Sequence, residues 1–109
     1  MRRADRLRDS KDFRRLSRQG LRKASPHFVT VVGEQGHELE GTGPVLGVTV
    51  SKKVGRAVER NRVKRRIREW FRHNRSALSS NAAIVVIARQ GAAEIGTRET
   101  QRELGGLLR

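Results

Sequence analysis

The sequence predicts an α+β fold in which helices cover one β-sheet as a two-layer sandwich. Three observations predict it: residues 58–74 carry apolar side chains at helical spacing, residues 28–32 and 82–88 are runs of strand-forming residues, and residues 45–50 alternate onto one apolar face. A chain of 109 residues can support one modest core but not two. We therefore expect a single domain over residues 1–109, with the element order α-β-β-α-β-α.

The chain is expected to begin with a polar arm over residues 1–9 and a short helix over about residues 10–19. Phe13 and Leu16 supply the apolar side of this helix, with Leu21 as a further candidate, and Gly20 can end it.

Two strands should follow. Pro26 favours an extended backbone before the strand at residues 28–32, and the Gly- and Glu-rich residues 33–43 are typical of a mobile hairpin connection that could hold an extra short strand. Residues 45–50 are the expected returning strand, with Leu46, Val48 and Val50 on one face.

The last third of the chain predicts a buried strand and a closing helix. Residues 82–88 are apolar throughout, as in strands covered on both faces, so this strand should be central. Thr97 can cap a final helix that ends near Leu108, and the expected inward side chains are Leu104, Leu107 and Leu108.

Charge is the strongest indication of function. The chain has 25 Lys and Arg against 11 Asp and Glu, a formal net charge of +14, which favours a polyanionic partner. No cysteine is present, which excludes disulfides, thiolate metal sites and a cysteine nucleophile. The chain has no apolar run of membrane-spanning length and no apolar segment at its N-terminus, so we expect no membrane association and a cytoplasmic location.

Residues 52–75 concentrate this charge, with eleven Lys and Arg against Glu59 and Glu69. Within this stretch, an apolar stripe at helical spacing should face the core and consists of Val63, Ile67, Trp70 and Phe71. The remaining positions must then form a row of cations that fits a phosphate backbone: Arg60, Arg62, Lys64, Arg65, Arg66, Arg68 and Arg72.

The sequence lacks an evident constellation for cutting RNA unaided, since its three histidines are scattered and Asp5, Asp9 and Asp12 are spaced like helix-start acids. A binding protein is therefore favoured over an autonomous metal nuclease. A small RNA-binding protein of ribosomal type remains an alternative on composition alone. A DNA-binding regulator is disfavoured, because residues 58–74 are flanked by strands and lack the preceding helix and tight turn of a helix-turn-helix.

The segment from Arg60 to Arg68, RNRVKRRIR, together with the lead-in VSKKVG at residues 50–55, resembles the signature of the bacterial ribonuclease P protein subunit family. The resemblance extends over nearly the whole chain, through Asp12-Phe13, Gly20, Phe28 and the strand at residues 84–89. It implies a ferredoxin-like or ribosomal protein S5 domain 2-like sandwich with a left-handed crossover. It also implies a protein that assists a catalytic RNA in removing the 5′ leader of precursor tRNA.

The resemblance further implies that Mg²⁺ is held mainly by the RNA subunit, that no metal is bound by the protein alone, and that one protein pairs with each ribonuclease P RNA. The implied contacts to this RNA are Lys52, Lys53, Arg56, Arg60, Asn61, Arg62, Lys64, Arg65, Arg66 and Arg68. A cleft for the leader would be lined by Phe13, Ser17, Phe28 and Val31, although Ser17 and Val31 stand where many relatives have aromatics. The residues alone favour the alternative that Phe13 and Phe28 are core residues.

Overall fold

The computed structural model describes residues 20–34, 43–78 and 82–108. Within them, four strands and two α-helices follow one another along the chain: β1 (Leu21–Ala24), β2 (Phe28–Glu34), β3 (Val45–Val50), α2 (Ala57–Asn74), β4 (Ala82–Ala88) and α3 (Thr97–Leu107). Short 3₁₀ turns, labelled η3 (Lys52–Val54), η4 (Arg75–Ala77) and η5 (Ala92–Glu94), join them. The helix expected over residues 10–19 lies outside the described residues, as do Phe13 and Ser17.

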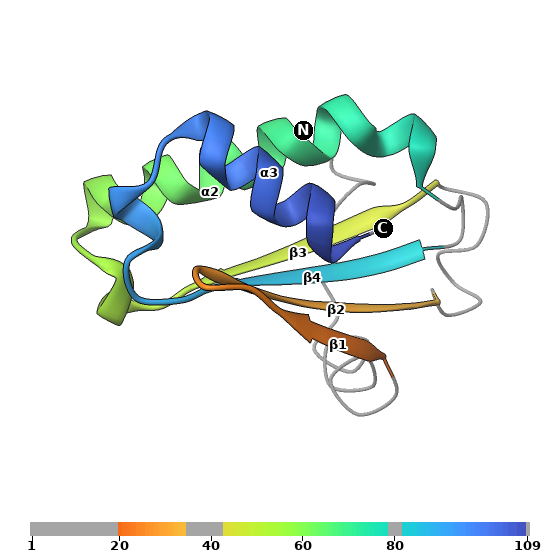
Figure 1. The fold of residues 1–109 in the computed structure, drawn as a ribbon, viewed down its shortest axis with the longest axis horizontal. Helices are drawn as coiled ribbons and strands as arrows, with labels where there is room; N and C mark the ends of the chain where they lie inside the picture. Colours follow the sequence, from red (N-terminus) through yellow and green to blue (C-terminus); the bar gives the residue numbers. More distant parts are fainter. Residues whose placement is uncertain (1–19, 35–42, 79–81, 109) are drawn as a thin grey trace.

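The four strands form one sheet in the order β1-β2-β4-β3 (Figure 1). β4 is central, as its apolar run predicts. It pairs antiparallel with β2, Phe28 lying opposite Ala88, and parallel with β3, Val50 also lying opposite Ala88. α2 is therefore the crossover between two parallel neighbours.

This topology corrects the expected hairpin between residues 28–32 and 45–50, because β3 does not pair with β2. β4 lies between them. The alternation of β3 specifies which of its faces is buried but not which strand it pairs with. Placing β4 in the middle removes both of its apolar faces from water and leaves the other strands at or near the edges.

A short strand that the sequence did not predict, β1, precedes β2. The extra strand expected within residues 33–43 falls largely on residues 35–42, which lie outside the described residues. Ser25 closes a tight β1–β2 turn by donating its backbone N–H to the Phe28 carbonyl at 2.8 Å. Leu21, a candidate for the apolar side of a helix, lies on this edge strand and is 64% exposed. The polar sequence of β1 carries little strand signal of its own, so pairing with β2 determines its conformation.

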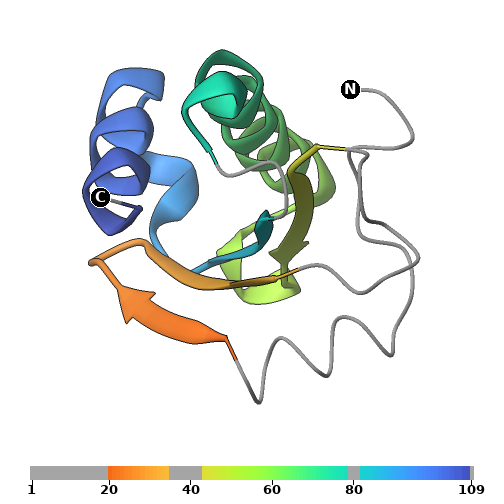
Figure 2. The same ribbon diagram turned by 90° about the vertical axis from the view of Figure 1, so that its right-hand side faces the viewer.

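Both helices cover the same face of the sheet, as Figures 1 and 2 show. The predicted apolar stripe of α2 is confirmed, since Val63, Ile67, Trp70 and Phe71 are all at most 3% exposed. These side chains pack with residues of the sheet and α3 in one core: Phe28, Leu46, Val50, Ile84, Val86, Leu104 and Leu107. Leu108 packs against its margin.

The opposite face of the sheet carries a second buried cluster of Val31, Val45, Ala83 and Val85. The two clusters alternate along β4, as successive residues of a strand must. This confirms that β4 is buried on both faces.

Thr97 does not cap α3, which corrects a further expectation. Gly96 is the N-cap residue, and no side chain caps the helix there. The Thr100 hydroxyl instead donates to the Gly96 carbonyl at 2.9 Å. A threonine marks the start of a helix only to within a residue or so, because a neighbouring glycine can take the extended cap conformation equally well.

Replacing Ile67 by Ala should destabilise the protein by about 2 to 5 kcal/mol, because the residue is fully buried and the change leaves a cavity. Urea unfolding followed by circular dichroism measures this. The control is Arg62→Ala on the exposed side of the same helix, which should change the free energy of unfolding by less than about 0.5 kcal/mol. Equal losses in the two variants would contradict the orientation of α2.

Candidate nucleic-acid interface

The basic segment begins where the chain leaves β3. In η3, Val54 is buried and holds the turn against the core, while Lys52 and Lys53 are exposed. Arg56 then takes an extended conformation, and its backbone N–H donates to the Glu59 carboxylate at 3.2 Å. This bond satisfies one of the free N–H groups at the start of α2. Three of the predicted RNA contacts thus lie exposed at the beginning of the helix.

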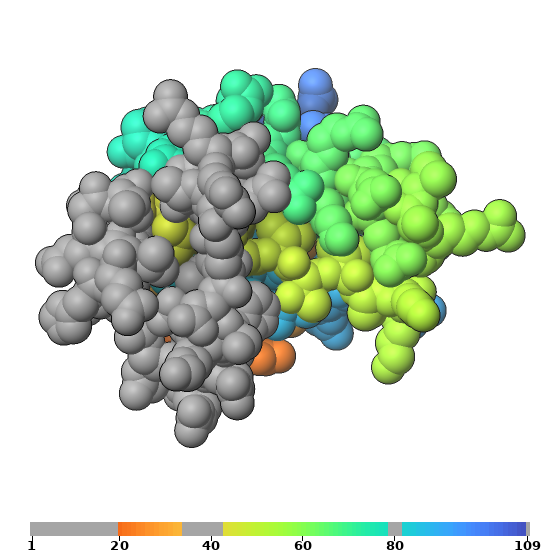
Figure 3. All heavy atoms as spheres, turned by 180° about the vertical axis from the view of Figure 1, so that it is seen from behind, coloured from red at the N-terminus to blue at the C-terminus, as the bar shows by residue number. Residues whose placement is uncertain are grey.

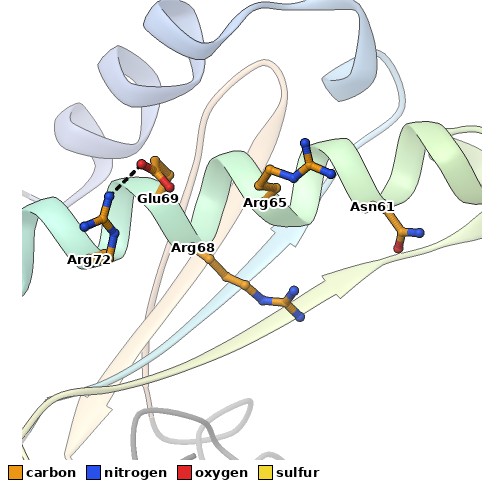
Figure 4. A pocket seen from close by; sticks show the side chains of 5 residues that line it. All are labelled: Asn61, Arg65, Arg68, Glu69 and Arg72. Carbon is orange, nitrogen blue, oxygen red and sulfur yellow. Dashed lines mark hydrogen bonds and ion pairs between the residues drawn. The ribbon is translucent and has the colours of Figure 1, made fainter. Parts of the chain in front are cut away.

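Along α2, a hollow of about 400 Å³ is lined by Asn61, Arg65, Arg68, Glu69 and Arg72 (Figure 4). At 100° per residue, these positions fall on the side of the helix opposite its apolar stripe. The structure therefore brings together three of the predicted contacts, Asn61, Arg65 and Arg68. Arg62 is also exposed. Figure 3 shows the molecule from behind, with α2 above β3.

Glu69 is the acid in this hollow, and it pairs with Arg72 at 2.7 Å. The hydrogen bond from Arg72, with the positive charge of that guanidinium, lowers the pKa of the Glu69 carboxyl. Both side chains are exposed, so the pair contributes little to stability. Arg72 has further N–H donors and can serve a second acceptor while this pair persists.

The other predicted contacts lie on the flanks of α2, where the surroundings are different. Arg60 is half-buried, and its Nε has no hydrogen-bond partner in the described part of the chain. Lys64 is half-buried as well. Arg66 donates to the Ile95 carbonyl and so ties α2 to the segment that leads into α3. Arg66 therefore has a structural role that its place in the basic row does not reveal.

The predicted leader cleft is not assembled as expected. Phe28 is fully buried in the core beneath the helices, so it is not available to stack on a base, and its assignment to the cleft is wrong. Val31 belongs to the cluster on the other face of the sheet. Two residues three apart on a strand point to opposite faces, so Phe28 and Val31 cannot line one cleft.

A polar cluster around Glu103 was not expected from the sequence. The Glu103 side chain is 9% exposed and accepts hydrogen bonds from the Ser25 hydroxyl at 2.6 Å and the His27 backbone N–H at 3.0 Å. His27 Nδ1 lies 2.6 Å from the second carboxylate oxygen. Arg89 donates from its side chain to the Ser25 carbonyl at 2.9 Å. The cluster fastens the β1–β2 turn to α3.

This cluster is structural and does not form a nucleophile relay, because Ser25 and His27 both bind the carboxylate and not each other. Burial raises the pKa of Glu103, but the hydrogen bonds from Ser25 and His27 outweigh burial and hold that pKa below its ordinary value. Ser25 and His27 lie more than 70 positions from Glu103 in the sequence, so no local pattern indicates these contacts.

No group of three or more His, Asp or Glu residues that could hold a metal ion occurs among residues 20–34, 43–78 and 82–108. Within the same ranges, no helix is long and apolar enough to span a membrane.

A two-layer α+β fold that displays an arginine-rich helix across its outer surface defines a class of small basic proteins suited to polyanions. The comparison with known families is specific: the ribonuclease P family model matches residues 1–109, and the chain belongs to that family.

The relatives agree in sequence and in structure. The chain is 44% identical to a ribonuclease P protein component of Desulforapulum autotrophicum, over 96% of this chain and 86% of the relative. It is 37% identical to the ribonuclease P protein component of Syntrophus aciditrophicus, over 99% of this chain and 87% of the relative. Among solved structures, it resembles a Staphylococcus aureus RNase P protein mutant with defective mRNA degradation activity, with a TM-score of 0.85 and 37% sequence identity. This likeness covers 96% of this chain and 86% of the Staphylococcus aureus chain. The Thermotoga maritima RNase P protein gives a TM-score of 0.79, 31% identity and coverage of 94% of both chains.

Replacing Glu103 by Gln should destabilise the protein by about 1 to 3 kcal/mol at pH 7, because charged hydrogen bonds to the β1–β2 turn are weakened. The pKa of Glu103 is lower in the folded state, so its contribution is complete above the unfolded pKa of about 4.3 and is lost as pH falls through the folded value. Thermal melts between pH 7 and pH 3 should therefore show a shallower loss of stability in the variant. Glu94→Gln, at an exposed position, is the control. A variant that kept the acid dependence of the parent protein would contradict this role.

Proposed function

We propose that this protein component of ribonuclease P binds the ribonuclease P RNA through the exposed cations of η3 and the outer face of α2. The observation that carries the proposal is the position of Asn61, Arg65 and Arg68 in one hollow on a helix whose other side is fixed in the core. Guanidinium groups form paired hydrogen bonds with phosphate oxygens. A fixed row of them binds a phosphate backbone without ordering a flexible segment first.

We further propose that the RNA subunit is the catalyst and that the protein assists it in cutting the 5′ leader from precursor tRNA, with one protein per RNA. Mg²⁺ prefers oxygen ligands and retains several of its waters, and RNA phosphates supply such ligands. The cationic face of α2 repels Mg²⁺. The protein then acts by holding the folded RNA and its substrate together while the phosphates of the RNA hold most of the metal.

Contact with the leader is proposed for the face of the sheet that carries Val31, since Phe28 lies in the core beneath the helices. Phe13 and Ser17, the other two residues of the predicted cleft, lie outside the described residues. Val31 is aliphatic at a position where many relatives have an aromatic residue, so it stacks on a base less favourably. Electrostatic contact with the leader backbone should therefore contribute more here than stacking does.

Adding the protein to ribonuclease P RNA should restore cleavage of precursor tRNA at a Mg²⁺ concentration too low for the RNA alone, because the cations of α2 reduce repulsion between phosphates. Gel analysis of 5′-labelled precursor tRNA measures the rate. Protein freed of RNA is the control and should leave the substrate intact. Binding without any gain in cleavage would favour the alternative of a ribosomal-type RNA-binding protein. Cleavage by the protein alone would instead favour a nuclease activity of its own.

Replacing Arg65 and replacing its neighbour Arg66 should have different effects on RNA affinity and stability. Arg65→Ala should leave stability nearly unchanged but weaken RNA binding, with a salt slope shallower by about 0.7 to 0.9 for a lost phosphate contact. Arg66→Ala removes the hydrogen bond to Ile95 and should cost roughly 1 to 3 kcal/mol of stability. Fluorescence anisotropy at several salt concentrations, with urea unfolding of each variant, separates the two. A loss of stability in the Arg65 variant with unchanged RNA affinity would contradict the assigned surface.

A further inference from the structure

A second hollow lies at the C-terminal end of α2 and shares only Arg72 with the row of cations predicted along this helix. It has a volume of about 470 Å³ and is lined by Pro44, Arg72, Arg75, Ser76 and Leu78. Arg72 also lines the first hollow, so the two adjoin along one side of the helix. From Asn61 to Arg75 the helical rise carries this surface over about 20 Å.

Arg75 is held at the junction between α2 and the start of β3. A Cβ built on Gly43 would lie 2.6 Å from the terminal nitrogen NH2 of Arg75, so the guanidinium rests directly against the backbone of this glycine. Gly43 has a φ of +83°, a conformation in which glycine is favoured. Because Gly43 has no side chain, the Arg75 guanidinium can occupy this position.

One wall of this hollow is apolar and is fixed by its packing. Pro44 is buried, and Leu78 packs against the margin of the helix-side core. Ser76 is exposed and adds a hydroxyl that can donate or accept. Two guanidinium groups and a hydroxyl therefore border a small, fixed apolar surface.

This combination fits a nucleotide better than a simple anion. The C-terminal end of a helix carries partial negative charge, which offsets part of the attraction that Arg72 and Arg75 exert on a small anion. A nucleotide gains a second contribution, because its base can lie against the partly exposed Leu78 while its phosphate meets the guanidinium groups. A base in a duplex is stacked between its neighbours, so only an unpaired nucleotide can enter.

We propose that this hollow binds one unpaired nucleotide of RNA, with its phosphate on Arg72 and Arg75 and its base against Leu78. The inference rests on the proposed RNA-binding function and extends that surface to the C-terminal end of α2. Arg72 keeps Glu69 as a partner and offers its remaining donors to the phosphate.

The test is nuclear magnetic resonance of the full chain, labelled at leucine methyl groups and arginine Nε, titrated with hexaadenylate. The comparison probes are an abasic hexanucleotide with the same phosphates and inorganic phosphate. The adenine ring current should shift the Leu78 methyls, the abasic chain should move the arginine signals alone, and inorganic phosphate should move neither set at equal concentration. Affinity for hexaadenylate should exceed that for the abasic chain by roughly 3- to 10-fold, less than an aromatic platform gives.

Arg75→Gln should abolish most of the Leu78 shift and make the salt slope for hexaadenylate shallower by about 0.7. The control is Arg98→Gln at an exposed position on α3, which should change neither quantity. Shifts at Arg65 and Arg68 with an unmoved Leu78 would overturn the inference and leave the proposed function standing. A chain that shows no shift at any arginine and does not bind ribonuclease P RNA would overturn the proposed function itself.

Discussion

The position of α2 on the sheet depends on the burial of four of its side chains. These are Val63, Ile67, Trp70 and Phe71, and each is almost completely removed from solvent. Full burial of each contributes on the order of 1.5 to 3 kcal/mol, so turning the helix about its axis by even one residue position would cost several kcal/mol. This packing fixes the rotation of the helix. Since successive residues are 100° apart, the same packing directs the residues of the first hollow away from the core. The placement of the cations thus depends on the apolar residues between them.

The concentration of positive charge has a physical consequence for the folded chain. Glu59 bonds to the backbone at the start of α2 and Glu69 pairs with Arg72, so the two acids of this helix act locally and leave most of its charge unneutralised. Like charges held on one face repel each other and oppose folding, and a bound polyanion removes that repulsion. The features that suit α2 to RNA therefore reduce the stability of the free protein, and RNA binding should raise it.

Arg66, Glu103 and Arg75 show that residue type alone does not reveal the role of a side chain. Arg66 has the same chemistry as Arg65 but anchors the segment before α3, and Glu103, on a charged helix, is withdrawn from water to hold a distant turn. Arg75 is placed by contact with the backbone of a glycine from another part of the chain. In each case the role follows from the neighbour that tertiary packing supplies.

The sequence by itself determined β2, β3, β4, α2 and α3 and the apolar faces of α2 and β4, because the periods of 3.6 and 2 are local properties of the chain. It indicated the stripe of α2, the central position of β4 and the segment where the cations gather. The tertiary structure alone decided that β4 separates β2 from β3, that β1 exists, and that Phe28 is core while Val31 faces the other side. Strand partners and side-chain neighbours are long-range contacts whose energy depends on the whole core, so a local pattern does not encode them.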